Sequence, residues 1–188
     1  MIITRATPSD LPRLLQYRNE ASDWLADRGI DQWRNAFPPD HILESIAAGS
    51  VFMVCEGGQT TATVTLDTEP EPDLWSSAEL LEPCLHLHKL IVLREFGGSG
   101  LGRRVLDWAG DRAARSGHRW VRINVNTQNR GLQRYYLDNG FEYVRTVEGG
   151  GVGGAGVAGW LAQRPACKND AHGLVDDLTE GESDVDVA

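Results

Sequence analysis

Apolar and polar residues follow two different periods along the chain, and together they predict one α/β domain without internal repeats. Alternation or a short apolar run is typical of strands, and such stretches occur at residues 2–5, 51–55, 59–66, 84–92, 120–125, 141–146 and 159–164. Apolar residues three and four apart are typical of amphipathic helices, and they occur at residues 11–29, 40–49, 98–116 and 129–139. The predicted order is therefore β-α-α-β-β-β-α-β-α-β-β.

Turn-forming residues separate these elements. Gly57 and Gly58 stand between two strand-like runs, which is a strong signal for a hairpin. Gly117 follows the third helical stretch and is a typical helix stop. Residues 67–80 are acidic and contain proline, so they are predicted to form a long loop.

The charge is concentrated at the C-terminus. Residues 166–188 hold seven acids against one base, Lys168, and so carry −6 of the formal net charge of −9. Too few apolar residues occur there to offset the entropy of folding. The sequence predicts a folded domain at residues 1–165 and an acidic, disordered tail at residues 166–188.

Composition excludes several classes of protein. A nearly neutral domain lacks the clustered cations that nucleic-acid binding needs. The sequence contains no run of about 18 apolar residues, so it predicts no membrane span. The N-terminal residues lack the layout of a secretory signal. The three cysteines, Cys55, Cys84 and Cys167, lack metal-ligand spacing. We therefore expect a cytoplasmic protein with reduced thiols and no metal; the sequence leaves open whether it forms a homodimer.

A glycine-rich loop connects a strand ending at Val92 to the helix that follows. Four glycines fall within the six residues 97–102. Glycine allows positive φ, so successive N–H groups can converge on an anion at the helix N-terminus. A Walker loop is excluded because Arg103, rather than lysine, follows Gly102. The spacing Gly98-x-Gly100-x-Gly102 also differs from a dinucleotide fingerprint.

This loop, and a second motif downstream, resemble the GNAT superfamily of N-acetyltransferases. The family pattern, Gln/Arg-x-x-Gly-x-Gly/Ala, begins five residues after a strand-ending valine. Here Gly97-x-x-Gly100-x-Gly102 keeps that register after Val92, although Gly97 replaces the Arg or Gln. The second motif, Asn-x6-Tyr-x-x-x-Gly-Phe, is matched from Asn129 through Tyr136 to residues 140–141.

The resemblance implies a GNAT fold, with a mixed, mostly antiparallel central sheet flanked by helices, and acetyl-CoA as co-substrate. It implies a general acid, Tyr136, which protonates the leaving thiolate, and a pantetheine contact, Asn129. Two alternatives stay open from the residues alone: Asn129 as an N-cap, with or without the cofactor contact, and Tyr136 as a helix-end aromatic residue packed over Phe141. The implied cofactor-binding residues are Leu90, Ile91, Val92, Gly97, Gly98, Ser99, Gly100, Leu101, Gly102, Arg103, Asn129 and Tyr136.

Two histidines lie on the strand before the glycine loop. Alternation places His86, His88 and Leu90 on one face of that strand. An ammonium must lose a proton before it can attack a thioester, and imidazole suits this task. The spacing resembles that of histidines in arylalkylamine N-acetyltransferases, so His86 and His88 are both candidate bases. The alternative, structural hydrogen bonding on a half-buried sheet face, stays open for each.

The acceptor is less well defined than the donor. Aromatic and acidic residues in the first helices and the acidic loop would suit a small cationic amine. Two alternatives stay open: a protein N-terminal or lysine acetyltransferase, and a non-catalytic acyl-CoA-binding module. The candidate acceptor residues are Trp24, Trp33, Phe37, Asp67, Glu69, Asp73 and Trp75.

Overall fold

The computed structural model describes residues 1–33, 38–71, 73–148 and 159–177. Within these residues, one sheet has the strand order β6-β7-β5-β4-β3-β2-β1-β8. Only the β1–β8 and β4–β5 pairs of that sheet are parallel. The strands are β1 (Ile2–Arg5), β2 (Val51–Glu56), β3 (Gln59–Asp67), β4 (Cys84–Val92), β5 (Trp120–Val125), β6 (Glu142–Thr146), β7 (Trp160–Pro165) and β8 (Val175–Asp176).

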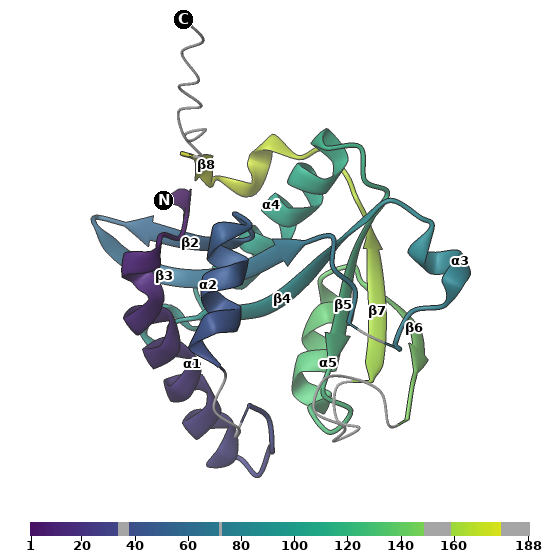
Figure 1. Ribbon diagram of the computed structural model, residues 1–188, viewed down its shortest axis with the longest axis horizontal. Coiled ribbons are helices and arrows are strands. Elements are labelled where there is room, and N and C mark those ends of the chain that lie inside the picture. Colours follow the sequence, from purple (N-terminus) through teal and green to yellow (C-terminus); the bar gives the residue numbers. More distant parts are fainter. Residues whose placement is uncertain (34–37, 72, 149–158, 178–188) are drawn as a thin grey trace, which may run out of the picture.

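Helices cover both faces of this sheet (Figure 1). They are α1 (Leu11–Ala26), α2 (Pro39–Ala47), α3 (Ser77–Leu80), α4 (Leu101–Arg115) and α5 (Arg130–Asp138), with short 3₁₀ turns at Pro8–Asp10 (η1), Arg94–Phe96 (η2) and Asp170–His172 (η3). On one face, Leu14 of α1 and Ile42 of α2 pack on Val51 and Met53 of β2. On the other face, α4 contributes the fully buried Trp108 to the larger core. The predicted mixed, mostly antiparallel sheet flanked by helices is confirmed.

The boundaries differ from the prediction at two places. The helix predicted to begin at Gly98 begins at Leu101, because Gly98 and Gly100 have φ of +76° and +79° and cannot continue a right-handed helix. The loop predicted at residues 67–80 contains the short helix α3. Its first turn is stabilised by a capping box, in which Ser76 and Glu79 satisfy each other's backbone N–H groups.

The predicted disorder of residues 166–188 is wrong for residues 166–177. Leu174 is buried in the main core, and β8 adds a parallel strand to the edge of β1. The Arg104 guanidinium donates hydrogen bonds to the carbonyl oxygens of His172 and Gly173. Composition misled the prediction because the basic residues that pair with this acidic segment lie far away in sequence, on α4. Residues 178–188 lie outside the described residues.

The docking of this segment predicts that Leu174→Ala lowers the free energy of unfolding by about 2–4 kcal/mol, the usual cost of truncating a buried leucine. Its neighbour Val175 is 63% exposed, so Val175→Ala should change stability by no more than about 0.5 kcal/mol. Urea unfolding of both variants measures the difference. Equal stability of the two variants would contradict the packing of residues 166–177 on the domain.

Candidate active site

The central feature of the candidate site is a split between the parallel strands β4 and β5. The strands pair only from Cys84 to His86 on β4, opposite Trp120 to Arg122 on β5. Both continue beyond this point, β4 to Val92 and β5 to Val125. Past His86, the backbone groups that face the other strand are therefore outside the ladder and need other partners.

A β-bulge on β4 accompanies the split. Thr65 of β3 pairs with His88 and Thr63 pairs with Ile91, so two residues of β4 lie opposite Val64. Lys89, within the bulge, has a left-handed backbone with φ of 49°. The extra residue shifts the alternation of side chains by one position.

This bulge overturns one expectation about the strand. Leu90 was predicted to share a face with His86 and His88. Instead Leu90 packs against the core beneath α4, the same core that contains Leu85 and Leu87. The two histidine rings do lie together, with their centroids 6.0 Å apart and nearly parallel.

The glycine loop lies at the N-terminus of α4, as the motif predicts. Within the described part of the chain, no hydrogen-bond acceptor is found for the amide N–H groups of Gly98, Gly100, Gly102 and Arg103. These donors and the helix dipole can hold a phosphate. The loop residues Gly97 to Gly100 are exposed, so a ligand can reach them.

Gly97, where the chain departs from the family pattern, lies close to the preceding turn η2. A Cβ at this position would lie 3.1 Å from the carbonyl oxygen of Arg94. A side chain here would therefore require η2 to shift by a few tenths of an ångström. The loop is shaped for backbone donors, while the Arg103 side chain is 74% exposed at its edge.

Asn129 is the N-cap of helix α5, which is the alternative that the residues alone suggested. Its side-chain oxygen accepts a hydrogen bond from the N–H of Leu132 at 3.0 Å. Its Nδ2 donates to the side-chain oxygen of Gln32 at 3.1 Å. The chain between α1 and α2 is thereby linked to the start of α5, next to the end of β5.

Tyr136 lies in the core between α5 and the sheet. It is 5% exposed, and its ring makes edge contacts with Tyr135 and Phe141 at 5.6 and 5.2 Å between centroids. It shares the core beneath α4 with Leu87 and Val125, which flank the split. Burial raises the pKa of Tyr136 well above its usual value, so the phenol keeps its proton at neutral pH.

The two histidines have different surroundings. His86 is 1% exposed; its Nε2 lies 3.4 Å from Cys84 Sγ, and its Nδ1 has no hydrogen-bond partner among the described residues. Burial and the neighbouring His88 lower the pKa of His86 to about 4. His88 is partly exposed, and its Nε2 lies 3.4 Å from a carboxylate oxygen of Asp67.

The structure brings only part of the predicted acceptor set to these histidines. Asp67 contacts His88, and Trp75 packs edge-on against His86 with centroids 5.7 Å apart. Trp24 instead stacks between Arg28 and Arg94 at the end of α1. Trp33 lies near Arg18, whose guanidinium carbon is 6.0 Å from its ring centroid, the Glu69 N–H donates to Asp67 at 3.0 Å, and Phe37 lies outside the described residues.

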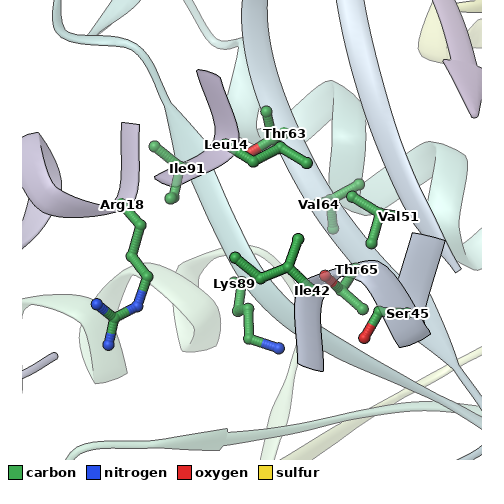
Figure 2. A pocket seen from close by; sticks show the side chains of 10 residues that line it. All are labelled: Leu14, Arg18, Ile42, Ser45, Val51, Thr63, Val64, Thr65, Lys89 and Ile91. Carbon is green, nitrogen blue, oxygen red and sulfur yellow. The ribbon is translucent and has the colours of Figure 1, made fainter. Parts of the chain in front are cut away.

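Sequence reasoning missed a cavity on the same face of the sheet, beneath α1 and α2. Arg18 of α1 and Lys89 of β4 both line it (Figure 2). Arg18 is one of four buried residues of α1. The set is Leu14, Arg18, Ser22 and Leu25, and each is three or four positions after the one before it. This helical spacing could have indicated from the sequence that Arg18 faces the sheet. The bulge that directs Lys89 to the cavity was not visible in the alternating pattern of the strand.

Two absences hold for the residues that the structure describes. None of their helices is long and apolar enough to cross a bilayer. They also contain no group of three or more His, Cys, Asp or Glu side chains that could hold a metal ion.

A sheet split between two parallel strands, with an anion-binding glycine loop at the helix that follows, is the architecture of the GNAT acyltransferases. The chain belongs to the acetyltransferase (GNAT) family, whose model matches residues 17–141. It is therefore an enzyme of the N-acetyltransferase class. It is 31% identical to an uncharacterized N-acetyltransferase, YesJ of Bacillus subtilis (strain 168), over 65% of this chain and 71% of YesJ.

Solved structures share the fold. A GNAT-family acetyltransferase from Listeria monocytogenes 4b F2365 aligns with a TM-score of 0.72 at 21% identity, covering 87% of this chain and 94% of that one. The PaiA N-acetyltransferase from Thermoplasma acidophilum, solved in complex with coenzyme A, aligns with a TM-score of 0.66 at 16% identity, covering 87% and 97%. The predicted GNAT fold is confirmed.

The burial of His86 predicts how stability depends on pH. Its pKa is about 4 in the folded protein and about 6.5 in the unfolded chain. Between these values only the unfolded chain binds the proton, so stability should fall as pH drops from about 6.5 to about 4. NMR titration should show one histidine titrating near pH 4, and His86→Asn should remove that signal. A His86 midpoint near 6.5 would contradict this assignment.

Proposed function

We propose that this protein transfers the acetyl group of acetyl-CoA to the primary amine of a small molecule. The observation that carries the proposal is the split between β4 and β5 beyond His86, with the glycine loop at the N-terminus of the helix that follows. A slot with free backbone groups suits the amide-containing pantetheine arm, and the loop suits a pyrophosphate.

The residues present fit coenzyme A. Backbone groups of Leu90, Ile91 and Val92 would bind the pantetheine arm along the split. The N–H groups of Gly98, Gly100, Gly102 and Arg103 would bind the pyrophosphate, without a side-chain contact from Gly97. The coenzyme A complex of the PaiA structure, which has the same fold, supports this choice of donor.

Of the two histidines, His88 suits the role of general base. A base works best when its pKa lies near the working pH, and His86 is too weak a base at about 4. His88 is partly open to solvent and has Asp67 beside it, which stabilises the imidazolium formed when it accepts a proton. His86, stacked on His88, would position that ring.

The proposed reaction needs one proton acceptor and one proton donor. His88 takes a proton from the acceptor ammonium, directly or through a water. The free amine nitrogen then attacks the thioester carbonyl carbon; a C–N bond forms and the C–S bond breaks. Tyr136, which stays protonated at neutral pH, gives its phenolic proton to the departing thiolate. The nitrogen loses its second proton as the C–S bond breaks, and that proton, directly or through a water, restores the phenol.

The proposal is tested by measuring thiol release from acetyl-CoA with a panel of small amines and with peptides bearing free N-termini or lysines. Turnover on small amines is the expected result. Turnover on peptides alone would support a protein acetyltransferase instead. Thermal stabilisation by coenzyme A without turnover on any acceptor would indicate a binding module.

The role of Tyr136 predicts that Tyr136→Phe lowers kcat by about 100-fold or more, because a general acid typically contributes that much. The dissociation constant for coenzyme A should change little. Tyr135→Phe is the matched control, because it removes a phenolic hydroxyl from the ring next to Tyr136. This variant should retain most activity. Equal kcat values for the two variants would exclude Tyr136 as the acid.

The role of His88 predicts that His88→Gln lowers kcat/KM and removes the acidic limb of its pH profile. His86→Gln should lower kcat/KM less and leave that limb in place, since a positioning residue does not exchange the proton. Steady-state kinetics from pH 5.5 to 9 separate the two. An unchanged profile in His88→Gln would show that another group is the base.

A further inference from the structure

The end of α1 and the chain after it connect the two strands that separate at the split. β4 ends at Val92 and β5 at Val125, and the ladder between the two strands ends at His86 on β4. On one face of the sheet, α4 contacts both strands. On the other face, α1 contacts β4, and the chain that leaves α1 turns toward α5 (Figure 1). We call residues 24–33 the α1 strap.

The first end of the α1 strap is held by the chain that leaves β4. The guanidinium carbon of Arg94 lies 3.7 Å from the centre of the Trp24 ring, and that of Arg28 lies 3.8 Å from it. Arg28 Nη1 also donates a hydrogen bond to the carbonyl oxygen of Trp24 at 3.0 Å. Arg94 begins η2, just after the end of β4. This cation–π contact therefore fixes the end of α1 to the connection between β4 and the glycine loop.

The second end of the α1 strap is held by the chain that leaves β5. Asn126 follows β5 directly, and its Nδ2 donates to the carbonyl oxygen of Asp31 at 3.1 Å. Asn129 Nδ2 donates to Gln32 Oε1 at 3.1 Å. Asn126 and Asn129 are 4% and 6% exposed. Removing either acceptor would take a partner from a buried amide, which is costly.

The backbone of the α1 strap is itself constrained near this second end. The Ser22 hydroxyl donates to the carbonyl oxygen of Gln32 at 3.3 Å, and Ser22 is buried. Trp33, the next residue, has a left-handed backbone with φ of 63°. This conformation is unfavourable for a large side chain, and it persists only where the surrounding contacts hold the backbone in place.

We propose that the α1 strap sets the separation of β4 and β5 at the open end of the split, and that Gln32 is a positioning residue for coenzyme A. Gln32 acts through Asn129 and the end of β5. A slot that is held at one width before its ligand arrives costs less to fill than one that must first be ordered. This inference rests on the proposed binding of coenzyme A in the split and does not depend on which acceptor is used.

Binding of coenzyme A, measured by isothermal titration calorimetry without an acceptor, tests the role of Gln32. Gln32→Leu removes the acceptor of Asn129 and should raise the Kd about 10-fold, as expected when only about a tenth of the molecules keep the competent slot. Gln32→Glu keeps an acceptor oxygen and should restore most of the affinity. Gln16→Leu is the matched control, since Gln16 donates only within the exposed face of α1, to Glu20. An unchanged Kd in Gln32→Leu would overturn the inference.

A shorter probe separates the slot from the glycine loop. 3′-Phosphoadenosine 5′-diphosphate keeps the pyrophosphate of coenzyme A and lacks the pantetheine arm. Gln32→Leu should bind this probe with the wild-type Kd, because the donors of the glycine loop lie at the start of α4 and do not contact Gln32. An equal loss of affinity for both ligands would indicate general damage to the fold and would overturn the positioning role.

A double-mutant cycle tests whether the two ends belong to one strap. Trp24→Leu removes the ring that Arg94 contacts and should also raise the Kd for coenzyme A. If releasing either end releases the whole strap, the double variant Trp24→Leu/Gln32→Leu should bind about as weakly as the weaker single variant. Effects of the two substitutions that multiply would show independent sites and would overturn the strap.

These titrations keep the inference apart from the proposed acetyl transfer. Weaker coenzyme A binding by Gln32→Leu, in a protein that acetylates no acceptor, would support the α1 strap and count against the reaction. Turnover of small amines with equal coenzyme A affinity in all variants would have the opposite meaning. A wild-type protein that binds no coenzyme A would overturn both. Circular dichroism confirms that each variant is folded, and Trp24→Leu alone tests the strap if Gln32→Leu is not.

Discussion

The structure depends on the point at which β4 leaves β5. Up to His86 the two strands satisfy each other's backbone groups, and beyond it they do not. Buried amides and carbonyls without partners are costly, so this separation is stable only where a ligand or water replaces the missing strand. The sheet stays intact because β4 remains paired with β3 as far as Val92, and β5 remains paired with β7 along its length.

The bulge at Lys89 connects this slot to the opposite face of the sheet. It changes which residues face α4 and which face α1 and α2. Leu90 and Val92 are directed to the core beside the slot, and Lys89 and Ile91 to the cavity. One extra residue therefore determines both the side chains beside the slot and those that line the cavity.

The sequence predicted the local geometry of the glycine loop and of helix α5 better than the tertiary arrangement around the cavity, for a physical reason. The glycine loop and the cap at Asn129 are local: their geometry follows from residues within one turn of the helix, so the motif places them correctly. The cavity joins Arg18 and Lys89, 71 positions apart, through tertiary packing that no local pattern records. Alternation also failed at Leu90, because a bulge interrupts the period without an evident signal. The docking of Leu174 was missed for the same reason as the cavity.

The different surroundings of His86 and His88 show why two identical side chains on one strand need not share a role. His86 faces Trp75 and lies beside the fully buried Arg122, whose charge also lowers its pKa. His88 lies two residues closer to the bulge, where the strand opens to solvent and Asp67 is within reach. The more deeply buried ring is thus held neutral at neutral pH, while the ring at the opening is partly exposed beside Asp67. The position of each histidine relative to the split, rather than the residue type, therefore sets how deeply its ring is buried.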